Sequence, residues 1–196
     1  FFFFTATGVL TSLAGSPYAT APLGGPDTVN YTSDGKFMFI GGTASPSGVS
    51  SYAIDSVTGL PTLVSSNVIA TGCNFAGQLV VDATNQFIYM SCNAGGSGGA
   101  GSGLAWYNIN TTTGAITFGG FIPNSGSGDA ISIDLTNTYV YMGTTGTAGP
   151  VGTCGTDAAH YTHGGVAVFQ LISGVPFYLT NCTHGDDSGS AGTRGS

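Results

Sequence analysis

The chain contains three segments of similar pattern: SDGKFMFIGG (Ser33–Gly42), ATNQFIYMSC (Ala83–Cys92) and LTNTYVYMGT (Leu135–Thr144). The aromatic runs begin at Phe37, Phe87 and Tyr139, so the copies are spaced 50 and then 52 residues apart. Each run is an almost continuous series of β-forming apolar residues, as expected of a strand that is buried on both faces. Sequence periods near fifty residues are typical of stacked β units. The repeat therefore indicates an all-β fold.

Four short strands can be assigned in each copy. The first strand alternates in character, as in Val29-x-Tyr31, Leu79-x-Val81 and Ile131-x-Ile133. A tight turn follows, because two residues before each aromatic run stands a residue type that tolerates positive φ, namely Gly35, Asn85 or Asn137. The third strand is expected at Tyr52-x-Ile54, Tyr107-x-Ile109 and Ala167-x-Phe169, each before a turn that contains Gly59, Gly114 or Gly174. With a fourth strand after that turn, each copy makes one propeller blade.

This pattern, SDGKFMFIGG followed by VSSYAIDSVTGLPTLVSS and ATG, resembles the repeats of the seven-bladed lactonase-like β-propellers, close to the 6-phosphogluconolactonase group. The resemblance covers about residues 1–180. It implies β-propeller-like, four-stranded antiparallel blades, with three complete blades behind a half-blade at the N-terminus. The expected divisions are a half-blade at 1–16, blades at 17–66, 67–120 and 121–180, and a blade entry with a flexible tail at 181–196.

The same resemblance implies a hydrolase with His, Glu and Arg residues around a central channel. This chain contains no Glu, and its one Arg is Arg194 in the expected tail, so no catalytic residue is carried over. We therefore expect an extracellular, structural, self-assembling protein without catalytic activity, and lactone hydrolysis only if the family activity is retained. Two alternatives stay open: a fragment of a lactonase-like hydrolase whose other blades carry the charged site, and a carbohydrate-binding or partner-binding propeller module.

Charge limits the range of partners. Only 6% of residues are charged, against roughly 25% in ordinary globular proteins, and the formal net charge is −7. Lys36 and Arg194 are the only Lys and Arg residues, so nucleic acid and anionic membrane surfaces are not expected partners. No apolar stretch has the roughly twenty residues of a membrane span. A half-blade leaves strand edges unpaired, and little like-charge repulsion opposes their pairing, so the expected partner is another copy of the chain.

The densest group of potential transition-metal ligands lies toward the C-terminus: Cys154, His160, His163, Cys182 and His184. The alternative is a Cys154–Cys182 disulfide that pins the long loop of the third blade, with the histidines on the surface. We favour the disulfide, and Cys73–Cys92 then forms the second bridge. An even cysteine count without a CxxC pair suggests an oxidising compartment, and hence secretion. Three sequons, at Asn30, Asn110 and Asn181, are candidate glycosylation sites in such a protein.

Two carboxylates are candidate calcium ligands. Asp27 and Asp129 occupy equivalent positions before the first strands of their copies, and carboxylates repeated around an axis suit Ca²⁺, which prefers oxygen ligands. The alternative is that these Asp residues cap turns by accepting bonds from nearby backbone N–H groups. We favour the turn role, so no cofactor is assigned and calcium stays a lesser possibility.

Overall fold

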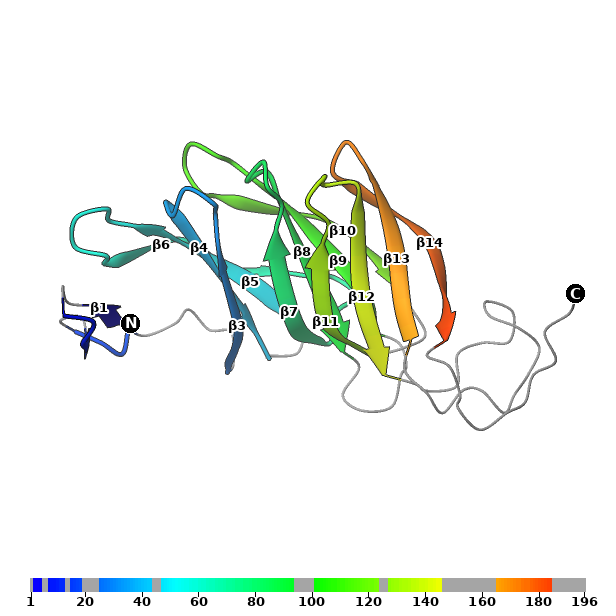
Figure 1. Cartoon of the computed structure of the whole chain (residues 1–196), viewed down its shortest axis with the longest axis horizontal. Helices are drawn as coiled ribbons and strands as arrows, with labels where there is room; N and C mark the ends of the chain where they lie inside the picture. Colours follow the sequence, from blue (N-terminus) through cyan, green and yellow to red (C-terminus); the bar gives the residue numbers. More distant parts are fainter. Residues whose placement is uncertain are drawn as a thin grey trace, which may run out of the picture.

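The computed structural model describes residues 2–4, 7–12, 15–18, 25–43, 47–93, 101–123, 127–145 and 165–184. Over these ranges the chain consists of strands and connections without a helix, and it forms three four-stranded antiparallel sheets and one two-stranded sheet. No helix that is long and apolar enough to cross a membrane is found in this described part. Figure 1 shows the three large sheets following one another in chain order, as neighbouring blades of a propeller do.

Each large sheet is an up-and-down meander whose strands pair in sequence order. The first sheet contains β3 (Pro26–Tyr31), β4 (Phe37–Gly42), β5 (Gly48–Ile54) and β6 (Pro61–Ile69). The second contains β7 (Phe75–Val81), β8 (Phe87–Asn93), β9 (Gly103–Ile109) and β10 (Ile116–Pro123). The third contains β11 (Ser127–Ile133), β12 (Tyr139–Thr145), β13 (Gly165–Ile172) and β14 (Val175–His184). The two-stranded sheet pairs β1 (Phe2–Phe4) with β2 (Leu10–Ser12), the segment expected to form a half-blade.

The turn between the first two strands of each large sheet has the conformation that its sequence favours. Gly35, Asn85 and Asn137 have φ angles of 71°, 59° and 54°. Gly meets no Cβ penalty in this left-handed region, and Asn tolerates it better than most residues. The repeat in the sequence is therefore a repeat in backbone geometry.

One predicted alignment was wrong by two residues. Tyr52 and Tyr107 lie opposite equivalent residues of β4 and β8, and the residue in that position of β13 is Phe169, not Ala167. The prediction aligned the three copies on the glycine of the following turn. In the third sheet this turn is shorter, because Ile172 and Val175 pair directly across it, so the glycine lies closer to the strand.

The sheets pack face to face. We call the side of each sheet that looks toward the next sheet its forward face, and the opposite side its backward face. Side chains of the first sheet's forward face, including Phe37, Phe39 and Val49, form one apolar cluster with the second sheet's backward face, including Leu79 and Met90. Because successive residues of a strand point to opposite sides, the second sheet can also contribute a forward face.

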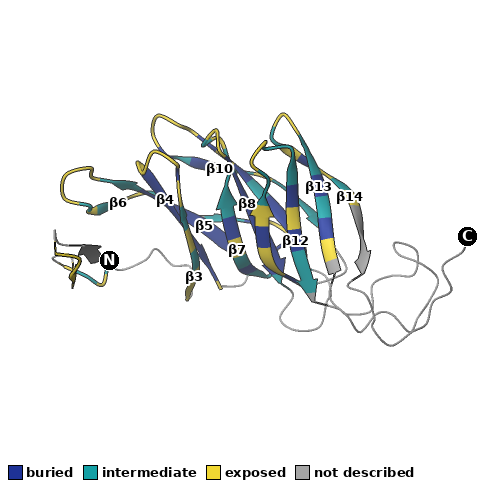
Figure 2. Ribbon diagram, viewed as in Figure 1, coloured by how far each residue is buried: buried dark blue, intermediate teal, exposed yellow. Residues whose placement is uncertain are grey.

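The second sheet's forward face forms the next cluster. Tyr89 and Leu104 are fully buried there against Ile131, Met142 and Phe169 of the third sheet's backward face. Most of the buried apolar residues belong to these two layers, and Figure 2 marks the buried stretches of the strands in dark blue. Most of the described hydrophobic core thus fills the two spaces between the three sheets, and a smaller cluster of Met38, Ile40 and Tyr52 lies on the first sheet's backward face.

Hydrogen bonds between turns repeat from one joint to the next. Asn85 Oδ1 accepts a bond from the backbone N–H of Ser33 at 2.8 Å, and Asn85 Nδ2 donates to Ser33 Oγ at 3.0 Å. Asn137 Oδ1 accepts from the N–H of Ala83, the residue equivalent to Ser33, at 3.1 Å. The turn Asn of each later sheet therefore attaches that sheet to the one before it.

Candidate functional site

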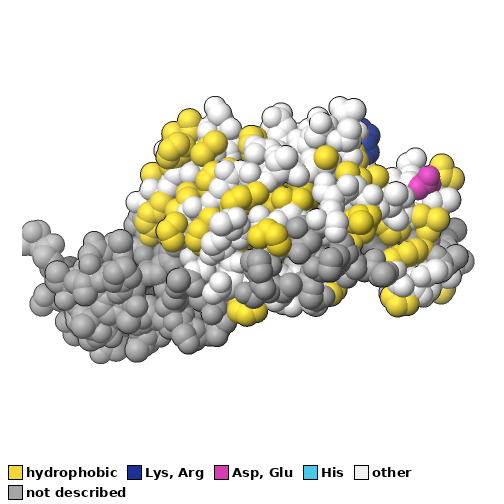
Figure 3. All heavy atoms as spheres, turned by 180° about the vertical axis from the view of Figure 1, so that it is seen from behind, with side chains coloured by type: hydrophobic (Ala, Val, Ile, Leu, Met, Phe, Trp, Pro, Cys, Tyr) yellow, Lys and Arg dark blue, Asp and Glu magenta, His cyan; other side chains and the backbone are white. Residues whose placement is uncertain are grey.

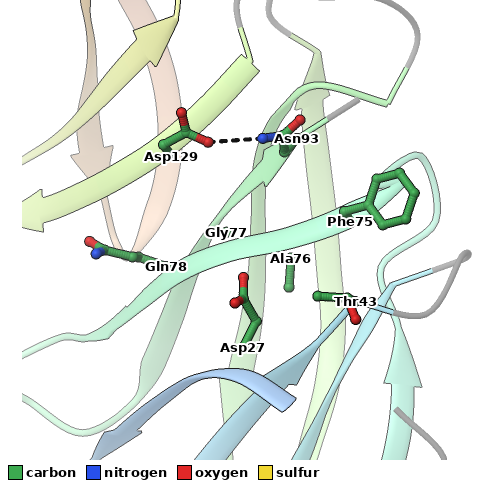
Figure 4. Close-up of a pocket in the computed structure, with 8 residues that line it drawn as sticks. All are labelled: Asp27, Thr43, Phe75, Ala76, Gly77, Gln78, Asn93 and Asp129. Atoms are coloured by element: carbon green, nitrogen blue, oxygen red, sulfur yellow. Dashed lines mark hydrogen bonds between the residues drawn. The ribbon is translucent and has the colours of Figure 1, made fainter. Parts of the chain in front are cut away.

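A pocket of about 620 Å³ lies near the starts of β3, β7 and β11, the first strands of the three large sheets. It is lined by Asp27, Thr43, Phe75, Ala76, Gly77, Gln78, Asn93 and Asp129. The first strands of neighbouring propeller blades lie beside the central channel. The pocket is therefore the place in this fold where polar groups from all three sheets converge, and Figure 4 shows their arrangement.

Strand irregularities direct the polar groups into this pocket. The pairing of β3 with β4 shifts register around Asp27, and the pairing of β11 with β12 shifts around Asp129, so each Asp is the extra residue of a β-bulge. In β7 the register shifts between Ala76 and Leu79, around the equivalent residues. Bulges re-aim side chains and are common next to functional sites. Asp27 and Asp129 thus lie within the first strands, whereas the sequence placed them before these strands.

The backbone of the pocket residues Gln78 and Asp129 is held by a buried hydroxyl. Ser91 Oγ accepts a bond from the N–H of Gln78 at 3.0 Å, and its hydrogen is within donating distance of the carbonyl oxygens of Gln78 at 3.2 Å and Asp129 at 3.3 Å. A Cβ on Gly77 would lie 2.5 Å from Ser91 Oγ and 2.8 Å from the Gly128 carbonyl oxygen. Only glycine lets β7 approach this closely, so backbone packing fixes the position of β7 beside the pocket.

The two carboxylates have different surroundings. Asp129 Oδ1 accepts a bond from Asn93 Nδ2 at 2.8 Å, which fixes both side chains at the rim. Asp27 lies on the other side of β7 in Figure 4. No described residue of the lining is Lys, Arg or His, while Lys36 pairs with Asp34 at 2.9 Å on an exposed turn. A pocket of this character suits hydroxyl donors or a cation and disfavours anions.

A metal at this pocket remains a prediction. Asp27 and Asp129 are brought to one cavity, but the described residues contain no group of three or more His, Cys, Asp or Glu side chains placed to share an ion. Ca²⁺ normally takes six to eight oxygen ligands. Backbone and amide oxygens of Gln78 and Asn93 would have to supply the remainder.

Two further aspartates, Asp82 and Asp134, cap the turns of the second and third sheets. Asp82 Oδ1 accepts bonds from the N–H groups of Gln86 at 2.8 Å and Phe87 at 2.7 Å. Asp134 repeats this arrangement in the third sheet. These carboxylates are occupied by their own turns, as Asx-type turns require.

The cysteine and histidine predictions fall partly outside the described residues. Cys73 and Cys92 form a disulfide with a Cα–Cα distance of 5.4 Å, which is the pair proposed from the sequence. Cys154, His160 and His163 lie outside the described residues, so the Cys154–Cys182 bridge stays a prediction. Cys182 and His184 belong to the last part of β14, from residue 180 onward, where only the backbone is described.

The sequons differ in their surroundings. Asn30 is half-buried and its Nδ2, the atom that would carry a glycan, donates to the Leu79 carbonyl oxygen at 3.0 Å. Asn110 is exposed in the β9–β10 turn, where its Oδ1 accepts bonds from the N–H groups of Thr112 and Thr113 at 3.0 Å. Asn181 lies in β14 and its side chain is not described. Glycosylation of these residues remains a prediction.

The sequence did not indicate Thr43, Gln78 or Asn93 as pocket residues. Asn93 was detectable as the polar residue that directly ends the aromatic strand of the second copy. Gln78 had no such signal, because its position depends on the bulge in β7.

The described residues thus form three blades of a β-propeller fold, with a polar pocket where their first strands meet. Among solved structures, the chain is similar to a putative 6-phosphogluconolactonase from Bacteroides fragilis, with a TM-score of 0.64 and 18% identity over 88% of this chain and 42% of that one. It is also similar to a putative 6-phosphogluconolactonase from Bacteroides uniformis, with a TM-score of 0.63 and 12% identity over 91% of this chain and 48% of that one. A periplasmic gluconolactonase from Pseudomonas aeruginosa matches with a TM-score of 0.60 and 16% identity over 83% of this chain and 41% of that one.

The chain therefore spans less than half the length of these three structures. At such identities the likeness shows the fold, which is the fold that the repeat predicted. No protein-family model matches the sequence, and no curated protein matches it.

Proposed function

We propose that this chain is a structural, self-associating propeller-like protein of the cell exterior, without hydrolytic activity of its own. One observation carries the proposal. Tyr141 in the third sheet is 40% exposed, whereas Phe39 and Tyr89, which occupy the equivalent positions in the other two sheets, are fully buried between sheets. The third sheet thus presents to solvent a surface of the kind that its neighbours use for packing, and such apolar surface favours association.

The chemistry of the pocket supports a non-catalytic role. Hydrolysis of a lactone needs a base for water and a donor for the developing oxyanion. Among the described residues, the pocket supplies two carboxylates, Asp27 and Asp129, and only uncharged side-chain donors for an oxyanion. The absence of Glu from the chain and the position of its single Arg near the C-terminus support the same conclusion.

The location outside the cell is supported by the Cys73–Cys92 disulfide, since disulfides persist in oxidising compartments. The similar Pseudomonas aeruginosa structure is that of a periplasmic protein. The three sequons would fit a secreted chain.

A neutral carbohydrate is the second candidate partner, and the pocket favours it. Asp27, Asp129 and the amides of Gln78 and Asn93 offer hydrogen-bond acceptors and donors in one cavity, and Phe75 adds an apolar ring. Sugars are bound by such mixtures of polar groups and aromatic faces. Two carboxylates would repel a phosphorylated sugar, so the candidate ligand carries no negative charge.

Light scattering of the purified protein over a hundredfold concentration range tests the main proposal, with electron microscopy of the same samples. We expect mass to rise with concentration and no acceleration of gluconolactone hydrolysis. Hydrolysis that an Asp129→Ala variant abolishes, while Asp34→Ala retains it, would favour the hydrolase instead. A mass equal to one chain throughout would rule out self-association.

A further inference from the structure

The exposed surface of the third sheet matches, position by position, the surfaces that form the two joints inside the chain. In register, Val166 of β13 corresponds to Leu104 of β9 and Val49 of β5. Leu104 and Val49 are fully buried, while Val166 is 37% exposed. Together with Tyr141, this residue shows that the third sheet's forward face exposes apolar side chains at positions that are buried at both internal joints.

The apolar surface extends to the outer strand of the same sheet. Ile172, Phe177 and Leu179 are 54%, 49% and 51% exposed, and alternation along β13 and β14 places them on the forward face. Figure 3 shows hydrophobic side chains at this end of the molecule. Exposed apolar side chains on this face therefore come from three strands, β12, β13 and β14.

The first sheet leaves one strand of the complementary surface exposed. Val29 of β3 is 51% exposed, whereas its equivalents Leu79 and Ile131 are 3% and 7% exposed, because each is covered by the preceding sheet. Tyr31, two residues further along the same side of β3, is 48% exposed. The middle of this backward face, where Met38 is located, is buried within the chain, so the open part is the inner strand.

We propose that the third sheet's forward face binds the exposed inner strand β3 on the first sheet's backward face of a second copy, head to tail, so that Val29 and Tyr31 are covered as their equivalents are at the joints between sheets. This inference rests on the proposed function and names its partner surface. Two forward faces pairing by two-fold symmetry would not reproduce either described joint. Head-to-tail contacts between identical copies build rings or filaments.

One element of the internal joints is absent at the proposed intermolecular joint. Each later sheet attaches through its turn Asn, but the first sheet has Gly35 in that position. Opposite it, the third sheet offers the N–H of Leu135, the residue equivalent to Ser33 and Ala83. A Gly35→Asn variant, at a φ that Asn85 and Asn137 adopt, should therefore strengthen association about fivefold, as expected for one added hydrogen bond.

The test uses two blocking variants of the full chain, Tyr141→Asp on the forward face and Val29→Asp on the backward face. Sedimentation velocity should show each variant alone associating at least about tenfold more weakly than the unmodified protein. An equimolar mixture should form a two-copy complex and nothing larger, because one intact face of each kind remains. Val57→Asp, at a turn residue that is 91% exposed, is the matched control and should associate normally.

The outcomes separate this inference from the proposed function. An unmodified protein that stays monomeric contradicts both. Association that persists in both blocking variants, or is abolished in them without recovery in the mixture, leaves self-association standing but contradicts the head-to-tail joint. Far-ultraviolet circular dichroism of each variant, together with the gain expected from Gly35→Asn, distinguishes a blocked surface from a misfolded chain.

Discussion

The ring of Phe87 occupies the space that a Cβ atom on Gly174 would need. Phe87 begins the aromatic strand of the second sheet, and Gly174 lies in the last turn of the third, where its carbonyl oxygen also accepts a bond from the Tyr89 hydroxyl at 2.8 Å. Phe37 and Gly114 stand in the same relation between the first and second sheets. A ring placed over a glycine turn is therefore a repeated part of the joint between sheets.

Replacing this glycine should destabilise the protein by two separate effects. Gly174→Ala adds a methyl group where the Phe87 ring lies, and it also places a non-glycine residue at a φ of 79°. We expect a loss of about 2–4 kcal/mol in the free energy of unfolding, measured by urea denaturation. Gly35→Ala is the matched control, because its φ is 71° and nothing lies within 4 Å of the added Cβ. It should cost only about 1 kcal/mol, and equal losses in the two variants would contradict the role of the ring.

The turn Asn of the second sheet should stabilise the joint through its side chain. Asn85→Gly keeps the positive φ accessible but removes both bonds to Ser33, and we expect it to lower the free energy of unfolding by about 1 kcal/mol. Asn85→Asp keeps an acceptor for the Ser33 N–H and loses the donor to its hydroxyl, so its urea midpoint should fall between those of Asn85→Gly and the unmodified protein. A glycine variant as stable as the original would show that the bonds contribute nothing.

Loss of the disulfide should destabilise the second sheet. Cys73 and Cys92 are 19 residues apart in sequence, and a bridge across a loop of this size stabilises a protein by about 3 kcal/mol. We expect a Cys73→Ala, Cys92→Ala double variant to unfold at lower urea concentration than the oxidised protein. Adding reductant should lower the urea midpoint of the unmodified protein by more than that of the double variant, which retains only the predicted Cys154–Cys182 bridge. Insensitivity of both to reductant would mean that the bridge does not form.

Acid should destabilise the protein through Asp134. The Thr136 hydroxyl and the N–H groups of Tyr139 and Thr138 lower the pKa of Asp134 from 3.8 to about 2. Because the folded-state pKa is lowered, the stabilisation is complete above pH 4 and is lost as the pH falls toward 2. Asp134→Asn should therefore make the urea midpoint less dependent on pH between 4 and 2. If the urea midpoint fell equally with pH in both proteins, the role of the ionised Asp134 carboxylate would be contradicted.

The sequence predicted the sheets well because their determinants are local. Apolar runs such as Phe37–Ile40 and turn residues such as Asn85 act within a few residues, so the first two strands of each copy could be placed directly. The third strand around Phe169 was placed correctly but was aligned two residues away from its equivalents, since a shortened turn changes the spacing between strand and glycine. The propeller class also followed, because the repeat length and strand count leave few alternatives.

The pocket was predictable only in part. Asp27 and Asp129 were selected as a pair from their equivalent positions, and the structure brings both to one cavity. The contribution of Gln78 could not be foreseen, because a bulge in β7 sets its direction and a bulge has no reliable sequence signature. The approach of β7 to Ser91 depends in the same way on packing between distant strands.

The second sheet is the only one of the three described large sheets that has a neighbouring large sheet on both sides. In a linear stack, each unit gains stability from its neighbours, so the units at the ends open more often than the unit between them. Amide protons of β8 and β9 should consequently exchange with solvent deuterium more slowly than those of β4 or β12. Any partner that covers an outer face would slow exchange in the adjoining end sheet first.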